Sequence, residues 1–161
     1  MFATLEGVET LDLQLASLPA DVLSRLEEKA RQLAATLADK VREEKLSGGV
    51  LQLRTGALKA SISSDVSIDG NEVNATVGSF GDIKYAAIQE YGGRTSAHEI
   101  LPDKAQALAF VIGGVQRFAR RVEHPGSTIP ASGYLQSSLD VARDEIVAEL
   151  SSAAQEAWED R

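Results

Sequence analysis

The chain has 161 residues, of which 43% are hydrophobic, and this is enough for one domain with a core of its own. A net charge of -8 argues against wrapping nucleic acid, and the lack of cysteine excludes disulfides, thiolate nucleophiles and cysteine-bound zinc. No run approaches the roughly 18 apolar residues of a membrane span, and the N-terminal segment has acids where a signal peptide would have lysines. We therefore expect a cytosolic protein without membrane contact.

The first part of the chain combines a weakly patterned segment with a long helix. Residues 1–18 are predicted to form a loosely ordered N-terminal arm, with an edge strand over residues 9–15. An amphipathic helix is predicted from Pro19 to Leu46, because apolar residues recur every three or four positions before Ser47-Gly48-Gly49 ends the pattern.

A second long helix is predicted at the other end of the chain, from Tyr134 to Trp158, with Ser132 as a candidate N-cap. Residues 131–161 carry seven acids and two bases, and we treat residues 151–161 as an acidic C-terminal extension. The simplest interpretation of these acids is a solvated helix face that keeps the protein soluble.

Two short helices and one hairpin are predicted between the long helices. The short helices cover residues 55–60, with Thr55 as N-cap, and residues 85–91. Strands over residues 63–68 and 71–78 are expected to meet at an Asp69-Gly70 turn, which would place Val66 opposite Val73. The polar segment from Arg94 to Pro102 is predicted to be mobile.

The main hairpin is expected within residues 105–126, about a Gly113-Gly114 turn, and to stop at His124-Pro125-Gly126. Because apolar residues fall on both of its faces, we expect both faces to be buried, one by the protein's own helices and the other by another subunit. The residues expected to line one face are Leu108, Phe110, Ile112, Val115, Arg117 and Ala119, and those of the other face are Ala109, Val111 and Phe118. The fold class predicted for residues 1–161 is a single α+β domain, with a small antiparallel sheet of two hairpins flanked by two long amphipathic helices.

The search for chemistry finds no strong motif. Neither a phosphate-binding loop nor a GxSxG elbow occurs, although a catalytic triad assembled in space stays open. His98-Glu99 begins like a zinc-protease motif, but Pro102 stands where the second histidine would be, and His124 lies in a predicted turn. We therefore predict no catalytic, cofactor or metal site, and no enzyme.

Four arginines stand out around the main hairpin: Arg94, Arg117, Arg120 and Arg121. One interpretation is exposed strand charge that discourages aggregation between sheet edges. Another is docking onto an acidic surface, including the acid-rich C-terminal helix of a neighbouring copy, because the guanidinium fork grips carboxylates. A nucleic-acid groove ranks third, since Phe118 is the only aromatic residue beside these arginines.

Several segments in order resemble the tail-completion, or neck, proteins of long-tailed bacteriophages, which are also described as minor tail or virion morphogenesis components. The segments are LRTGALKASI (53–62), YAAIQEYGG (85–93), ILPDKAQALAFVIGG (100–114) and FARRVEHPGSTIPASGYLQSSL (118–139). Their motif and turn residues are Arg54, Thr55, Gly56, Tyr85, Glu90, Tyr91, Gly92, Gly113, Gly114, His124, Pro125 and Gly126. The chain departs from the family pattern at Ser-Gly-Tyr-Leu, where Arg-Pro-Phe-Leu is frequent, and in the acidic extension.

The resemblance implies a structural virion protein without cofactor, assembled in the host bacterial cytoplasm as a ring, commonly sixfold, between the head connector and the tail tube. Double-stranded DNA would pass transiently and non-specifically through its centre, and acidic walls would let it slide. The expected contacts with neighbouring subunits come from residues 92–102 and from the main hairpin, namely Arg94, Phe110, Ile112, Val115, Arg117, Phe118, Arg120 and Arg121. The alternative is a small cytosolic adaptor or regulatory module that binds a protein partner along the edge of the Asp69-Gly70 hairpin.

Overall fold

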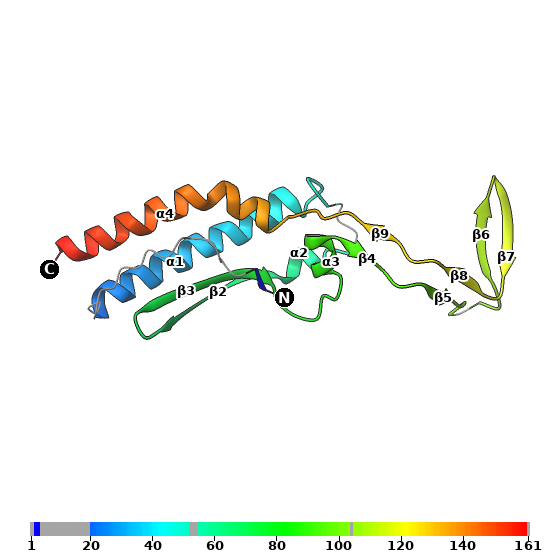
Figure 1. Ribbon diagram of the computed structural model, residues 1–161, viewed down its shortest axis with the longest axis horizontal. Helices are drawn as coiled ribbons and strands as arrows, with labels where there is room; N and C mark the ends of the chain where they lie inside the picture. The colour runs from blue at the N-terminus through cyan, green and yellow to red at the C-terminus, as the bar shows by residue number, and fades with distance from the viewer. Residues whose placement is uncertain (1, 4–19, 52–54, 104, 161) are drawn as a thin grey trace.

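The computed structural model describes residues 2–3, 20–51, 55–103 and 105–160. The protein is elongated: a body of helices and a small sheet continues into a narrow β-ribbon (Figure 1). The fold is α+β, as the sequence predicts, and the strands of every described sheet pair antiparallel. The predicted strand over residues 9–15, nearly all of the N-terminal arm and Arg54 lie outside the described residues.

Both long helices form where the apolar periodicity predicts them. Helix α1 (Ala20–Lys40) continues into one π-helical turn, η1 (Val41–Lys45), and α4 spans Gln136–Glu159. Figure 1 shows α4 lying along α1, with α1 between α4 and the sheet. Because α1 is covered on two sides, its buried positions include small residues such as Ala30, Ala34 and Ala38, which let the other layers approach closely.

Ion pairs join the two long helices along their exposed margin. Bases on α1 meet acids on or next to α4 in the pairs Arg25–Asp160 (2.6 Å), Lys29–Glu149 (2.5 Å) and Lys40–Glu145 (3.3 Å). Pairs this exposed contribute about 0–1 kcal/mol each to stability, so they orient the helices more than they hold them together. Residues 151–159 of the acidic extension are thus part of α4, and Asp160, which directly follows it, pairs with α1.

The body sheet has the strand order β1-β3-β2, with β1 at Phe2–Ala3, β2 at Ile62–Asp69 and β3 at Glu72–Ser79. The predicted pairing of Val66 with Val73 is wrong, because Val66 lies opposite Ala75. Asp69 pairs with Glu72, so the turn residues are Gly70 and Asn71. Gly70 has φ +61°, and a glycine at the first central position satisfies a two-residue hairpin turn.

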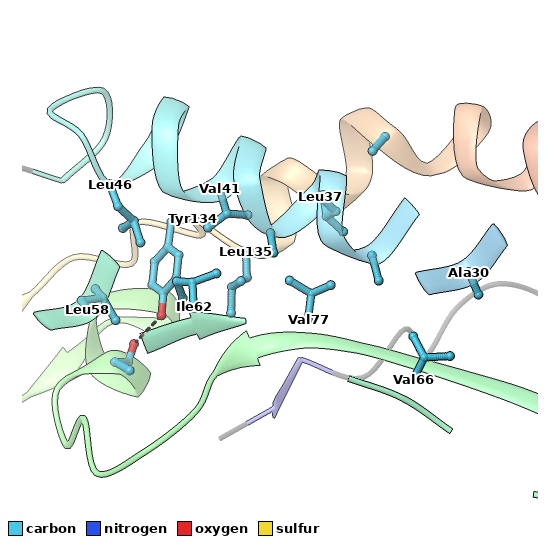
Figure 2. Close-up of a cluster of buried hydrophobic side chains, with 14 residues drawn as sticks. Ala30, Leu37, Val41, Leu46, Leu58, Ile62, Val66, Val77, Tyr134 and Leu135 are labelled. Atoms are coloured by element: carbon cyan, nitrogen blue, oxygen red, sulfur yellow. Dashed lines mark hydrogen bonds between the residues drawn. The ribbon is translucent and has the colours of Figure 1, made fainter. Parts of the chain in front are cut away.

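The core lies between α1 and the inner face of this sheet. Figure 2 shows Leu37 and Val41 above Val77 and Ile62 of the strands, with Tyr134 and Leu135 beside Ile62 in the middle of the cluster. The buried residues of this cluster are Ala30, Ala34, Leu37, Ala38, Val41, Leu46, Leu58, Ile62, Val66, Val77, Ala86, Tyr134, Leu135 and Ala142. The outer face of the sheet carries serine, asparagine, threonine and acids, so the body sheet has one apolar side, as predicted.

Two short helices complete the body, α2 at Ala57–Ser61 and α3 at Ala86–Tyr91. The N-cap of α2 is Gly56, with φ +73°, rather than the predicted Thr55. The Thr55 hydroxyl still accepts the Ala57 N–H at 3.4 Å, so it serves the first turn of the helix from one residue further out.

Within the segment from Arg94 to Pro102, Arg94 and residues 98–100 belong to strands and Thr95 is hydrogen-bonded to Ser127, so the segment is more ordered than an irregular loop, and its mobility stays a prediction. His124 likewise ends a strand and does not lie in a turn. The strands beyond the body are β4 (Gly93–Arg94), β5 (His98–Ile100), β6 (Leu108–Ile112), β7 (Val115–Ala119), β8 (Val122–His124) and β9 (Thr128–Ile129).

Candidate interaction site

We call residues 93–129 the arm, because they leave the body at α3 and return to it at α4 (Figure 1). The half of the arm nearer the body, which we call the lower ribbon, is one continuous pair of strands formed by residues 93–100 and 122–129. Gly93 pairs with Ile129 and His98 with His124, in a single antiparallel frame. Between these pairs the Thr95 N–H donates to the Ser127 carbonyl (2.9 Å), and the Ser127 N–H donates to the Thr95 hydroxyl (2.8 Å). The outgoing and returning segments of the ribbon are therefore hydrogen-bonded to each other along its length.

Gly126 makes this close pairing possible. Its φ of +85° lies in the left-handed region, and a Cβ at this position would collide with the carbonyl oxygen of Thr95 across the ribbon. Only glycine meets both demands. The predicted stop at His124-Pro125-Gly126 is thus a local irregularity in a ribbon that continues to β9.

The arm changes direction before its end. Seven residues, 101–107, connect β5 to β6, whereas two residues, 120–121, connect β7 to β8. Strands joined by such unequal connections cannot continue in the same pairing frame. The β6–β7 hairpin, which we call the tip, accordingly runs across the direction of the ribbon in Figure 1.

The tip has the turn and the register that the sequence predicts. Gly113 and Gly114 both have positive φ angles, +59° and +79°, as a tight two-residue turn requires. Ile112 lies opposite Val115, and Phe110 lies opposite Arg117. These pairs place Phe110, Ile112, Val115 and Arg117 on what we call the front face, with Val111 and Phe118 on the back face.

The tip exposes apolar side chains on both faces. Val111 is 68% exposed, Ile112 64%, Val115 53% and Phe118 68%. The tip forms its own two-stranded sheet, and Figure 1 places it at the end of the molecule opposite the long helices. Within the described part of the chain no helix packs on the tip. The expectation that the protein's own helices cover one face of this hairpin is therefore wrong. An apolar projection of this kind is typical of a surface that meets another protein.

The four arginines of the arm have two different roles. Arg121 Nε lies 2.8 Å from Glu99 and its Nη2 lies 3.3 Å from Glu123, so Arg121 joins β5 to β8 within the same chain. Arg94, Arg117 and Arg120 are exposed and have no ion pair among the described residues. These three are available to meet acids on another molecule.

The two histidines of the chain stack on each other across the arm, with ring centroids 5.0 Å apart. His124 Nδ1 accepts the Gly126 N–H at 3.0 Å, so the neutral ring carries its proton on Nε2. His98 Nδ1 lies 3.1 Å from the Ser96 carbonyl oxygen and donates to it in the neutral ring. The two rings therefore pack against each other across the ribbon, and in the neutral ring of His124 the Nε2 is a hydrogen-bond donor.

Glu90 anchors the arm to the body. This residue of α3 is 5% exposed, and its two carboxylate oxygens accept the N–H groups of Leu135 and Gln136, each at 2.9 Å. Those N–H groups belong to the start of α4, where the helix dipole favours a negative charge. Glu90 thus caps a helix that begins about 45 residues later, directly where both ends of the arm enter the body.

The loop before α4 donates hydrogen bonds to carbonyl groups of α3. The Ser132 hydroxyl donates to the Gln89 carbonyl at 2.6 Å, so the prediction of Ser132 as N-cap of the last helix is wrong. The Gly133 N–H donates to the Glu90 carbonyl at 3.0 Å. Gly92, with φ +71°, passes so close to this loop that a Cβ would lie 2.6 Å from the Ala131 nitrogen. The 85–93 and 129–136 segments are therefore joined by several hydrogen bonds, and together we call them the root of the arm.

Tyr134 fills the space beneath this root. It is almost fully buried, and its hydroxyl lies 3.5 Å from the Ala86 carbonyl oxygen (Figure 2). Burial raises the pKa of the Tyr134 phenol well above its ordinary value, and the Glu90 charge raises it further. The other two tyrosines of the chain, Tyr85 and Tyr91 in the 85–93 motif, are exposed.

The remaining motif residues and hollows lie in the body. Thr55 and Gly56 begin α2, whose Leu58 packs in the same core as Ala86 of α3. An open groove of about 390 Å³ lies between the start of α1 and the end of α4, and charged and polar side chains line it. Across the described ranges, no three side chains of the metal-binding types gather at one place.

Comparisons with protein-family models, curated proteins and solved structures give no match for this chain. None of the described helices is both long and apolar enough to cross a membrane. The arm, its tip and the charges around them are therefore the features of the molecule that bear on its function.

Proposed function

We propose that this chain is a structural protein of the head–tail junction of a long-tailed bacteriophage, where copies of it form a ring that joins the connector to the tail tube. The observation that carries the proposal is the arm. It holds an apolar tip away from the protein's own core, on a paired ribbon whose root is hydrogen-bonded to the body. In an assembly the exposed apolar side chains of the tip are buried against a neighbour, whereas in a monomer they stay in contact with water.

The geometry of the arm supports a ring in particular. A tip that meets a different surface on the next copy makes a head-to-tail contact, and repeated contacts of this kind generate closed rings when the rotation closes. The lower ribbon, residues 93–100, spans about 25 Å at roughly 3.3 Å per strand residue, which is enough to reach across to a neighbour.

The distribution of charge fits the same assembly. The arm carries five basic and three acidic residues, and the rest of the chain carries 11 basic and 21 acidic residues. An acidic ring repels the phosphate backbone, so double-stranded DNA can pass through without being retained. In this proposal the protein acts in the virion after assembly in the bacterial cytoplasm, without catalysis or cofactor.

A second candidate function follows from the body sheet. Strand β2 pairs only with β3 among the described strands, so its other edge can accept an extended peptide as an added strand. This feature favours a small adaptor or regulatory module that binds a protein partner along β2.

The direct test is to mix the purified protein with tail tubes or with capsids that carry a connector, and to examine the mixtures by electron microscopy. We expect collars at the junction with the unaltered chain, and none with Val111→Ser/Phe118→Ser, which changes two exposed tip residues. An adaptor predicts the reverse dependence: the tip variant binds its partner normally, and a charge or proline placed in β2 abolishes binding. Persistent failure to form any joint assembly contradicts the proposal.

A further inference from the structure

The acids of α4 fall into two groups. The helix contains six acids and one base, Arg143, and two of its acids pair with lysines of α1. Asp140, Glu156 and Glu159 accept hydrogen bonds from polar side chains one turn away on α4 itself. Asp144 is exposed and has no side-chain partner within the described residues.

Asp144 lies beside the most exposed large hydrophobic side chain of the body. Val141, one turn earlier on α4, is 83% exposed. Residues three apart on a helix share a face, and Ala148 extends this stripe by a further turn. We call Val141, Asp144 and Ala148 the outer stripe of α4, which faces away from α1.

The front face of the tip complements this stripe in chemistry and in spacing. It presents Ile112 and Val115 next to the unpaired Arg117. Val115 and Arg117 are two strand residues apart, or about 7 Å. Val141 and Asp144, three helix positions apart, are separated by about 5–6 Å between Cβ atoms. An apolar contact and an ion pair can therefore form together, because the long arginine side chain covers the small difference.

A competing acidic surface lacks the apolar part. The outer face of the body sheet carries Asp65, Asp69 and Glu72, but serine, asparagine and threonine separate them. It would satisfy Arg117 and leave Ile112 and Val115 against polar side chains, which gives little gain from burial.

We infer that the tip of one copy docks on the outer stripe of α4 of a neighbouring copy, with Ile112 and Val115 against Val141 and with Arg117 paired to Asp144. The contact is intermolecular, because the ribbon holds the tip at the end of the molecule opposite α4 (Figure 1). The inference deepens the proposed function by naming the surface that receives the arm, and it rests on that function only for the setting in which copies meet.

The lack of cysteine in the chain makes a clean crosslinking test possible. Full-length Ile112→Cys/Val141→Cys is treated with a short bis-maleimide, alone at high concentration and in mixtures with tail tubes. The matched control is Ile112→Cys/Ser67→Cys, which places the second thiol on the acidic but polar outer face of the sheet. The single variant Ile112→Cys reports contact between two tips.

We expect covalent oligomers from Ile112→Cys/Val141→Cys in at least tenfold higher yield than from either control. Asp144→Arg should reduce this yield at least tenfold, and adding Arg117→Glu to that variant should restore most of it. Equal yields from the Ser67 control, crosslinks from Ile112→Cys alone, or no crosslink from any variant in any mixture overturn the inference.

The two proposals fail separately. Crosslinks between tip and α4 in a protein that joins no phage component keep the inference and refute the junction function. Collars on tail tubes whose crosslinks map to the sheet or to paired tips keep the function and refute this docking surface.

Discussion

Replacing Glu90 by glutamine tests whether one buried carboxylate holds the root of the arm. The glutamine side chain would keep a single acceptor oxygen, and its amide NH₂ would face the other of the two N–H groups at the start of α4. A charge-assisted hydrogen bond in a buried site contributes about 1.5–3 kcal/mol, and the favourable interaction with the helix dipole adds up to about 1 kcal/mol. Relief from burying a charge offsets part of this loss.

The expected cost of Glu90→Gln is therefore about 3 kcal/mol in the free energy of unfolding. In a chain of this size that loss lowers Tm by about 6–12 °C. The assay is urea unfolding followed by circular dichroism, with thermal unfolding as a second measurement. Hydrogen exchange should show the largest loss of protection at residues 132–136.

The matched control is Glu145→Gln, which removes the same charge from an exposed pair with Lys40. This variant should lose less than about 1 kcal/mol, because exposed ion pairs contribute little. If the two variants lose equal stability, or if Glu90→Gln loses less than about 1 kcal/mol, Glu90 does not act as the cap of α4 and the account of the root is wrong.

Three further predictions concern the arm and the core. Gly126→Ala should destabilise the paired arm by about 1–2 kcal/mol because of the left-handed φ alone, and the clash with the Thr95 carbonyl oxygen adds to this cost. Amide exchange checks this prediction, since it should become fast in the arm and stay unchanged in the body. Because burial raises the pKa of Tyr134, the native state keeps a proton that the unfolded chain loses above about pH 10. Stability should fall there by up to about 1.4 kcal/mol per pH unit, and urea unfolding at about pH 9 and about pH 11 should show a smaller fall in Tyr134→Phe. Val111→Ser/Phe118→Ser should change the stability of the monomer by less than about 1 kcal/mol, since both side chains are exposed, and unfolding of a dilute sample checks this.

The body could be predicted from the sequence because its signals are long. The apolar stripes of α1 and α4 persist over many turns, and the alternation in β2 and β3 marks one buried face. The register of that hairpin is a different matter. Asp69-Gly70 and Gly70-Asn71 are both good turn pairs, and the two registers place the same side chains on the same face. The hydrophobic pattern therefore cannot choose between them.

The lower ribbon of the arm could not be predicted because its strands are two or three residues long. Gly93–Arg94 pairs with residues more than 30 positions later, and no periodic pattern fits within so short a strand. The sequence did contain one usable sign: the His98-Glu99-Ile100 run meets the Val122-Glu123-His124 run in reverse order.

The capping role of Glu90 could not be predicted either, because it depends on a contact between residues far apart in the sequence. Local capping rules search within about three residues of a helix start, and there the sequence offers Ser132. The actual cap comes from another helix 45 residues earlier, and only the folded chain brings it there. The tip, in contrast, was predicted in turn, register and faces, because two glycines fix the turn and every pairing follows from it.

In the proposed assembly, a neighbouring copy of the chain covers the exposed tip. Hydrogen–deuterium exchange of residues 108–119, measured on the dilute protein and on the assembled ring, tests it most directly. We predict rapid exchange at the solvent-facing edges of the tip in the dilute protein and strong protection of the same amides, together with residues 141–148, in the ring. Equal exchange of these amides in both states would show that no neighbouring copy covers the tip.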